Sequence, residues 1–448
     1  MFDPKQRTAC GLIHRDRFVN KSANGASYAA GEHAARAGVS RHSEGVKILV
    51  ETAAFGCSAA RAAVFPLHGK FNLRRTVEGS RPHIIRQGCS PAAFAFTILA
   101  ATGHRDNLLP SQSPISVAVV GVGVFGRNHA RVYKELEQQG EPVRLLGVVD
   151  PDTARADAVA REFGCKAFGS VAQLVTTHSE VQAASIAAPT VHHLSVASEL
   201  MKAGVDVLIE KPLAASLSEA EQLAKLATAH KRIVQVGHLE RFNPAVQATL
   251  PILTQPMFFE VHRLSVFTPR SLDVDVVLDL MIHDLDIVLA FAKSPVREVR
   301  AVGLPVLSGK VDIANVRLEF ESGCIANFTA SRVSTERVRK LRFFQPRQYV
   351  SLDYGRQEVL VFTVGSDGAS AGTPSVNPQI GVNKIAVAAE EPLHAELKSF
   401  LRAVRQRSTP VVSLEDGQRA LGLALEIVGA IREHGKKVGL AGMAKAKN

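Results

Sequence analysis

A glycine-rich motif between an apolar strand and a helix constrains this chain more than any other feature. Residues 115–120 (ISVAVV) form a β-branched run that is typical of a strand buried on both faces. Gly121, Gly123 and Gly126 follow in the pattern G-x-G-x-x-G, and a helical pattern continues to about residue 139. In such a unit the first glycine makes the tight turn, the second lets the backbone approach a pyrophosphate, and the third allows close packing of helix on strand. The motif therefore predicts a dinucleotide site with the phosphates at the helix N-terminus.

An acidic residue ends the next predicted strand. Residues 143–149 are mostly apolar, and Asp150 follows them, 24 positions after Gly126. This is near the usual spacing of about 20 for the acid that binds the adenosine ribose. A carboxylate there accepts hydrogen bonds from the ribose hydroxyls and repels a 2′-phosphate. Because Pro151 and Asp152 come next rather than an arginine, the sequence favours NAD over NADP.

Strands and helices alternate through residues 115–236, which predicts a doubly wound parallel sheet, a Rossmann NAD-binding domain. After Gly237 the pattern changes to alternating strands with tight connections, interrupted by one long helix over about 274–291 and followed by two amphipathic helices. We expect residues 237–435 to form an α+β domain with a large open, mainly antiparallel sheet and helices on one face. A polar stretch over 365–379 is expected to be a loop, and residues 436–448 a basic tail.

The first 114 residues differ from the rest. They hold 15 of the 53 Lys and Arg but only 7 of the 42 Asp and Glu, and they show no sustained periodicity. We expect residues 1–114 to be a poorly ordered basic extension that takes no part in catalysis, either an upstream mis-start or a transit peptide. Because the extension has no Trp and Tyr28 as its single Tyr, it lacks a stacking platform, and we do not expect nucleic-acid binding.

Composition excludes several other classes. No window offers the roughly 18 consecutive apolar residues of a spanning helix, so we expect no membrane partner. The five cysteines stand far apart without a C-x-x-C pair, which argues against a disulfide scaffold or a zinc-finger array and favours a cytoplasmic location. We expect no metal site.

Polar residues that could carry chemistry occur in three further segments. Glu210 and Lys211 end a predicted parallel strand, where open α/β sheets place their ligands. Residues 236–244 link the two domains and are rich in polar groups. Asp279 and His283 lie four residues apart on one side of the long predicted helix.

Together these segments resemble the Gfo/Idh/MocA family of oxidoreductases, named after glucose–fructose oxidoreductase and inositol dehydrogenase. The resemblance covers residues 115 to about 434. It rests on the glycine motif, residues 188–193 (APTVHH), 210–212 (EKP), 237–243 (GHLERFN) and the Asp279–His283 pair, all in the family's order. Thr190 departs from the pattern, since the family often has Asn there.

The resemblance implies that Lys211, Asp279 and His283 meet beside a nicotinamide ring. We assign His283 as the base that takes the hydroxyl proton, Asp279 as the group that holds it, and Lys211 as the group that polarises the same oxygen. The opposite assignment, with Lys211 as the base, stays open, since a sequence determines neither distances nor pKa values. His193 is expected either to contact the cofactor or to cap its helix. The full set of implied cofactor contacts is Gly121, Gly123, Val124, Phe125, Gly126, Asp150, Ala188, Thr190, His193, Glu210 and Lys211.

The substrate is less constrained than the cofactor. The segments 239–244 and 278–286 are similar to those of family members that oxidise the 3-hydroxyl of UDP-N-acetylglucosamine, which leads to diamino sugars of lipid A. Arginines suit the diphosphate of such a substrate. The candidate substrate-binding residues are Arg241, Asn243, Arg263 and Asp286, with Arg270 and Arg332 as further arginines. A dehydrogenase of a free sugar or inositol is the alternative, and a non-catalytic NAD-binding regulatory protein is a more distant one.

The open sheet predicts an oligomer. A sheet with helices on one face leaves its other face uncovered, and such a face is normally hidden. We therefore expect a homodimer or homotetramer built through the second-domain sheet.

Overall fold

The computed structural model describes residues 113–268, 274–365 and 380–439. Nearly all of the expected extension, Arg270, the expected 365–379 loop except Gly365, and most of the basic tail lie outside the described residues. None of the helices within the described ranges is both long and apolar enough to cross a membrane.

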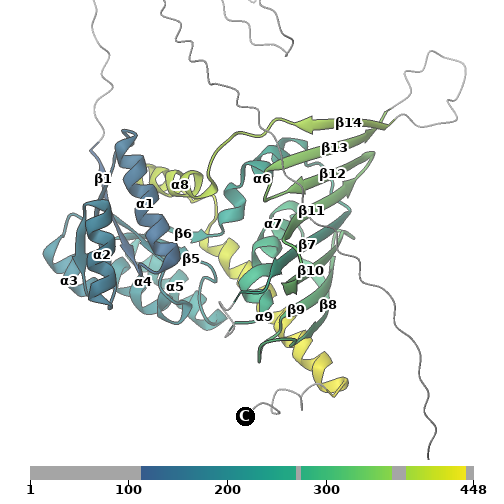
Figure 1. The fold of residues 1–448 in the computed structure, drawn as a ribbon, viewed down its shortest axis with the longest axis horizontal. Coiled ribbons are helices and arrows are strands. Elements are labelled where there is room, and N and C mark those ends of the chain that lie inside the picture. The colour runs from purple at the N-terminus through teal and green to yellow at the C-terminus, as the bar shows by residue number, and fades with distance from the viewer. Residues whose placement is uncertain (1–112, 269–273, 366–379, 440–448) are drawn as a thin grey trace, which may run out of the picture. The chain divides into compact units, whose positions relative to one another are not determined.

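The first sheet has six parallel strands in the order β3-β2-β1-β4-β5-β6 (Figure 1). The strand order reverses between β1 and β4, and open sheets of this kind bind their ligands beside that reversal, at the carboxyl ends of the strands. This confirms the predicted Rossmann fold, although the short helix α3 was not expected. The strands are β1 (Ile115–Val120), β2 (Val143–Val149), β3 (Lys166–Phe168), β4 (Ala183–Ile186), β5 (Asp206–Glu210) and β6 (Val234–Gly237). The helices are α1 (Val124–Gln138), α2 (Thr153–Phe163), α3 (Val171–Thr177), α4 (His193–Lys202) and α5 (Leu217–His230).

The second sheet has eight strands in the order β14-β13-β12-β11-β7-β10-β9-β8. Its pairs are antiparallel except for β7 with β10, so the sheet is mixed and mainly antiparallel, as predicted. The edge strand β14 was not expected. The strands are β7 (Phe258–Val266), β8 (Val296–Leu304), β9 (Ile313–Phe320), β10 (Ile325–Ser334), β11 (Val338–Gln345), β12 (Gln348–Asp353), β13 (Glu358–Val364) and β14 (Ile380–Ile385).

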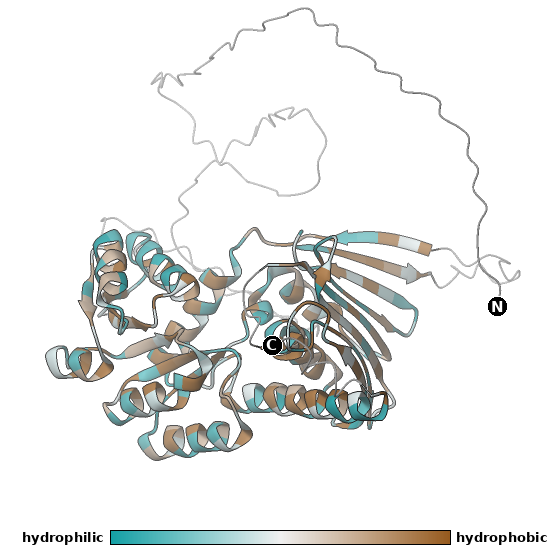
Figure 2. Cartoon of the chain, turned by 60° about the horizontal axis from the view of Figure 1, so that its bottom comes forward, coloured by the Kyte–Doolittle hydropathy of each residue, from teal (hydrophilic) through white to brown (hydrophobic). Residues whose placement is uncertain are grey.

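Helices pack on one face of this second sheet. The short α6 (Pro244–Thr249), α7 (Ile282–Ala292) and the long α9 (Leu414–Lys437) contribute buried residues to the same apolar core as the inward side chains of the strands. Along the inner strands of the sheet, as in β9, buried and more exposed residues alternate. Most helices show both teal and brown along their length in Figure 2, as expected of elements with one buried and one exposed side.

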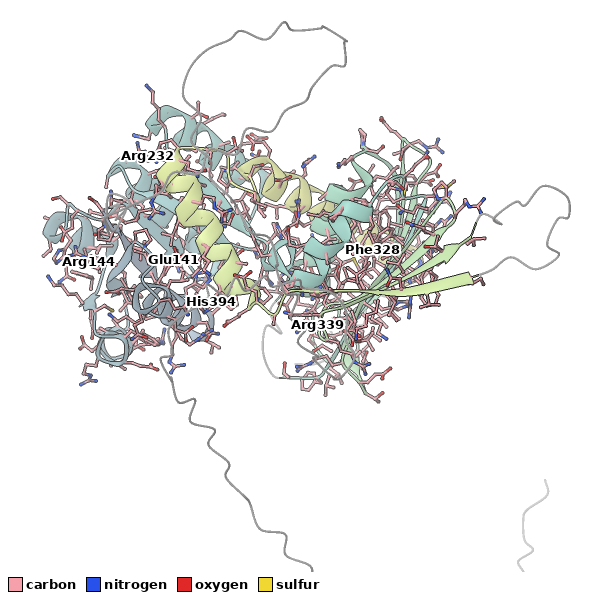
Figure 3. The ribbon with its side chains drawn as sticks, turned by 90° about the horizontal axis from the view of Figure 1, so that it is seen from above. Glu141, Arg144, Arg232, Phe328, Arg339 and His394 are labelled. Atoms are coloured by element: carbon pink, nitrogen blue, oxygen red, sulfur yellow. The ribbon has the colours of Figure 1, made fainter. Side chains whose placement is uncertain are left out.

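The helix α8 (Pro392–Gln406) follows the second sheet in sequence but packs in the core of the first. Leu397 and Phe400 are fully buried in one cluster with Val117 of β1 and Tyr133 of α1. Figure 3 shows His394 of this helix beside the first domain, whereas Phe328 lies in the second sheet. The first domain therefore does not end at residue 236. Its core also includes α8, which comes about 155 residues later in the chain.

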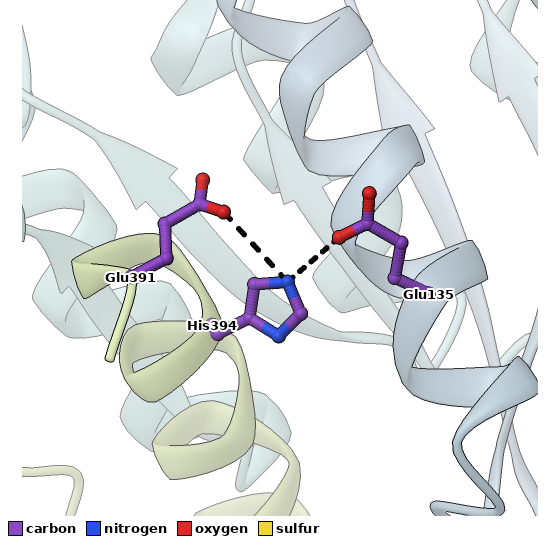
Figure 4. A group of neighbouring side chains, drawn as sticks. All are labelled: Glu135, Glu391 and His394. Atoms are coloured by element: carbon purple, nitrogen blue, oxygen red, sulfur yellow. Dashed lines mark hydrogen bonds and ion pairs between the residues drawn. The ribbon is translucent and has the colours of Figure 1, made fainter. Parts of the chain in front are cut away.

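An ion-pair cluster holds the start of α8 against α1 (Figure 4). His394 Nε2 lies 2.7 Å from Glu135 Oε2 and 3.8 Å from Glu391 Oε2. Arg131 Nη1 donates to both Glu135 oxygens, at 3.0 and 2.9 Å, and Arg131 also pairs with Glu391. The two carboxylates thus already have a cation between them, so we interpret the cluster as a clamp between helices rather than a metal site.

A glycine in α9 should be essential for the contact between α9 and the first sheet. An added Cβ at Gly417 would lie 2.7 Å from Val236 of β6, whereas one at Gly429, in the same helix, meets nothing within 4 Å. We expect Gly417→Ala to lower the free energy of unfolding by about 1–3 kcal/mol through overpacking. Gly429→Ala should be neutral or raise it by up to about 1 kcal/mol, since alanine favours a helix. Urea denaturation of both variants tests this, and equal effects would contradict the α9–β6 packing.

Candidate active site

Two glycines of the turn between β1 and α1 are required by the close packing around them. Gly121 has φ +82°, and a Cβ there would lie 2.6 Å from the backbone nitrogen of Ala188. A Cβ on Gly126 would lie 1.8 Å from the carbonyl oxygen of Gly121. These positions are closed to any side chain because β1, α1 and the end of β4 approach so closely.

Gly123 is different, because no part of the chain requires it. A Cβ there meets nothing within 4 Å, and the residue is exposed, as are its neighbours Val124 and Phe125. A glycine with free space above it, at the start of α1, fits a backbone that a ligand approaches. The observed geometry thus fits the dinucleotide phosphates that the motif predicts.

Asp150 is buried at the end of β2 and holds the glycine loop. Its Oδ2 accepts the N–H of Val122 at 2.9 Å, and its Oδ1 accepts that of Asp152 at 3.0 Å. Arg155 Nη1 lies 3.3 Å from both carboxylate oxygens. No arginine follows Asp150 directly in the sequence, but the first turn of α2 brings Arg155 back to the acid. The lack of an arginine is therefore no longer an argument for NAD over NADP.

His193 is occupied by backbone carbonyls. It is buried at the start of α4, with Nε2 2.9 Å from Ala188 O and Nδ1 3.0 Å from Pro212 O. Burial lowers the pKa of this imidazole, and the carbonyl contacts oppose the shift. The ring ties the end of β4 to the loop after β5, which favours the structural one of its two predicted roles. Thr190 begins the 3₁₀ turn η1 (Thr190–His192), next to Ala188.

Lys211 reaches from the end of β5 to the second domain. Its Nζ donates to the backbone oxygen of Asp279 at 2.8 Å and lies 3.7 Å from the Asp279 carboxylate oxygen Oδ1. Burial lowers the pKa of the ammonium, while the charge of Asp279 acts in the opposite direction. The side chain is 19% exposed, and that of Asp279 28%, so both remain accessible from outside.

Asp279 lies in a local widening of the long helix. The segment η4 (Val277–Met281) is a π-helical turn in which Ile282 N–H bonds to Val277 O, five residues back, and a regular α-helix begins only at Ile282. The predicted single helix is therefore divided between Asp279 and His283. Such π turns are frequent at functional sites.

His283 is held neutral. Burial, and then the positive charges of Lys211 and Arg263, keep the pKa of its imidazole well below the ordinary value. Its Nδ1 is buried and has no hydrogen-bond partner in the described part of the chain. The structure thus brings Lys211, Asp279 and His283 together, with one lysine, one carboxylate and one uncharged imidazole.

The residues predicted to bind the substrate are largely engaged within the protein. Arg241 binds Asp286 through Nε at 2.6 Å and Nη2 at 3.0 Å. Arg263, only 4% exposed, binds Asp284 through Nε at 2.6 Å and Nη2 at 2.9 Å, and it also binds Glu240.

The other candidates for substrate contact are also held by neighbours. Asn243 caps α6 by accepting the N–H of Ala245 at 3.0 Å. Arg332 donates to Val274 O. These contacts indicate that the side chains form a framework under the site, and they hold without a ligand.

Three buried or unpaired groups near the site were missed by the sequence analysis. His238, directly after β6, is 1% exposed, and neither ring nitrogen has a partner among the described residues. Arg339 of β11 is exposed, and its guanidinium makes no hydrogen bond or ion pair within the described ranges, although its charge reaches His283. Glu396 of α8 is fully buried. Sequence patterns do not identify these residues readily, because each comes from a different part of the chain.

Comparison with known proteins agrees with the two-domain fold. Residues 115–238 match the model of the "Oxidoreductase family, NAD-binding Rossmann fold", and residues 256–349 match the "GFO/IDH/MocA C-terminal domain". UDP-N-acetylglucosamine 3-dehydrogenase from Acidithiobacillus ferrooxidans is 37% identical over 310 residues, which is 69% of this chain and 95% of the relative. This chain belongs to the Gfo/Idh/MocA family. It is accordingly an NAD(P)-dependent oxidoreductase.

Two further similarities cover different shares of this Gfo/Idh/MocA chain. A solved structure of the A. ferrooxidans enzyme superposes with a TM-score of 0.65 and 34% identity, covering 72% of this chain and 99% of that one. Inositol 2-dehydrogenase from Rubrobacter xylanophilus is 30% identical over 231 residues, 49% of this chain and 65% of the relative.

The glycine loop generates a prediction that separates folding from cofactor binding. Gly123→Ala should leave the free energy of unfolding nearly unchanged, because the new methyl group has free space, yet it should weaken NADH binding by about tenfold or more by obstructing the phosphates. Gly126→Ala should lower both stability and binding, because its methyl group collides with Gly121 O. NADH fluorescence titration and thermal unfolding of the two variants measure this. Full NADH affinity in Gly123→Ala would place the phosphates elsewhere.

Proposed function

We propose that this protein is an NAD-dependent sugar dehydrogenase that oxidises the 3-hydroxyl of UDP-N-acetylglucosamine to the 3-keto sugar, a step toward lipid A diamino sugars. The observation that carries the proposal is the group formed by Lys211, Asp279 and His283 at the carboxyl end of β5. The relative that carries the UDP-N-acetylglucosamine name matches both domains. Sugar oxidation is also supported by the inositol dehydrogenases among the relatives.

The chemistry follows from the charges at the site. Oxidation of a secondary alcohol removes a hydride from carbon and a proton from oxygen. NAD, held by the glycine loop, Asp150 and Glu210, would supply the hydride acceptor. The uncharged His283 is ready to accept the hydroxyl proton at neutral pH, since its pKa lies well below the ordinary value. Lys211, fixed by two contacts to Asp279, donates to the same oxygen and stabilises the negative charge that develops there.

The pH profile distinguishes the two possible bases. With His283 as the base, kcat/KM for sugar oxidation should stay flat from about pH 7 to 9, because the imidazole is already neutral there. Lys211→Ala should lower kcat by roughly 100-fold at every pH in this range. Steady-state rates of NADH formation in both proteins measure this. A rate that rises through pH 7–9 in the wild type and loses that rise in Lys211→Ala would make Lys211 the base.

Arg339 is the residue that we assign to the diphosphate of the substrate. It lies opposite Arg263 in the β7–β11 pair, at the start of β11, and Figure 3 shows it toward the first domain. The charge of Arg339 acts on His283, yet no carboxylate binds this guanidinium among the described residues. An arginine without an internal partner suits a phosphate group better than Arg241 or Arg263, which are already paired.

A second candidate is the oxidation of a free sugar or inositol. The pairing of Arg241 and Arg263 with carboxylates favours it, because these arginines then offer nothing to a diphosphate. A screen of NADH formation at 340 nm with UDP-sugars, free hexoses and inositols decides between the two.

The assignment of Arg339 can be tested with a pair of matched variants. We expect Arg339→Gln to raise KM for UDP-N-acetylglucosamine at least tenfold, since one charge-assisted contact is lost, with little change in kcat. Arg342→Gln serves as the control and should behave as the wild type, because Arg342 is also in β11 but pairs with Glu260 of the neighbouring strand β7. Activity on inositol but not on UDP-sugars would contradict the proposed substrate.

We also propose that a second copy of the chain packs on the outer face of the second sheet. Phe258, Phe344, Tyr349 and Phe362 stand side by side on four neighbouring strands, with ring centroids 5.5, 4.8 and 5.0 Å apart. Val382 of β14 continues the row and is 60% exposed. An apolar row of this extent favours a homodimer or homotetramer. A monomeric mass in light scattering would contradict this.

A further inference from the structure

Glu396 is the most deeply buried acid near the cofactor site. It lies in α8, has no exposed surface, and neither carboxylate oxygen has a hydrogen-bond partner in the described part of the chain. Its helical neighbours Leu397 and Phe400 belong to the apolar core of the first domain. A carboxyl group in such a place costs free energy, and an apolar side chain of the same size would be more stable.

The face of the sheet under α8 connects Glu396 with Glu210. Gln235 of β6 donates from Nε2 to the backbone oxygen of Glu396 at 3.2 Å. Gly237 lies two residues further along β6, hence on the same face, and is paired with Glu210 of β5. The Glu210 carboxylate occupies the space above Gly237, where an added Cβ would lie 2.6 Å from Oε1. Glu210 therefore lies on the sheet face that α8 covers, and Glu396 belongs to that covering helix.

The charges around this pair are unbalanced. Burial and the charge of Glu210 raise the pKa of the Glu396 carboxyl well above its usual value. Burial also raises the pKa of the nearby Tyr133, whose hydroxyl pairs with Ser185. His129 Nε2 lies 3.1 Å from Glu210 Oε1, so Glu210 has a partner that Glu396 lacks. Two neighbouring buried carboxyls do not both ionise, and the one without a partner keeps the proton.

We propose that Glu396 is a positioning residue for the cofactor: its buried carboxyl group, which has no hydrogen-bond partner in the described part of the chain, is the polar group on the covered sheet face that keeps Glu210 aimed at the nicotinamide ribose. This inference rests on the proposed cofactor site. Lys211 follows Glu210 directly, and its N–H lies 3.3 Å from Glu210 Oε2, so the orientation of Glu210 also affects the catalytic lysine. An apolar group in place of Glu396 would remove the polar neighbour of Glu210 and leave the orientation of the Glu210 carboxyl group less fixed.

Two substitutions separate this role from a structural one. Glu396→Gln keeps a neutral polar side chain and should bind NADH within about threefold of the wild type. Glu396→Leu should unfold at the same temperature or higher, yet bind NADH about tenfold more weakly, because Glu210 loses the polar neighbour that orients it. ADP, which lacks the second ribose, should bind both variants as it binds the wild type. Ser399→Ala, a buried polar residue on the same helix, is the control.

Each other result overturns the inference. Unchanged NADH binding in Glu396→Leu would make Glu396 a structural residue. Equal losses of NADH affinity in Glu396→Gln and Glu396→Leu would mean that Glu396 acts as a charged carboxylate. If the leucine variant does not fold, a large loss of NADH affinity in Glu396→Gln alone would give the same result. A wild type that binds NADH but oxidises no sugar would contradict the proposed function alone. Normal turnover with unchanged NADH binding in Glu396→Leu would contradict this inference alone.

Discussion

The contact between Lys211 and Asp279 joins the two halves of the proposed catalytic site. One partner stands at the end of a Rossmann strand and the other in a π turn of the second domain, 68 positions later in the chain. The ammonium binds a backbone oxygen, so its position depends on the local shape of that turn as well as on the Asp279 side chain. Burial lowers the pKa of the lysine and, with the lysine's charge, keeps His283 neutral. The same contact thus sets both the geometry and the protonation of the site.

Two helices hold the two sheets in this relation. The chain leaves the second sheet, returns as α8 into the core of the first, and then passes as α9 along both. Gly417 of α9 packs directly on Val236 of β6, and Ile431 near its other end packs on Gly303 of β8. The buried pairs of Arg241 with Asp286 and Arg263 with Asp284 add a charged framework beneath the site. Removing one partner of such a pair would leave an uncompensated buried charge, so these residues act through the fold even where they touch no ligand.

The arginines show what sequence reasoning leaves open. Arg241 and Arg263 are predicted to meet a diphosphate, and in the structure each binds a carboxylate of its own chain. Arg339, which was not considered, is left without an ion pair in the described ranges. Arg155 returns to Asp150 although it lies five positions beyond it. Nothing in a one-dimensional pattern tells a paired arginine from an unpaired one, because the partner usually comes from another element.

The sequence by itself determined the parts that depend on local pattern. The glycine motif after an apolar strand predicts the phosphate loop, since the spacing of its glycines is a local pattern of strand, tight turn and helix. The change from helix–strand alternation to strand–strand alternation predicts two different sheets. Only the tertiary structure decided that α8 belongs to the first domain, that the long helix widens at Asp279, and that Glu396 and Glu210 share a buried face. These features come from packing between residues far apart in the chain, and their energies depend on neighbours that periodicity does not identify.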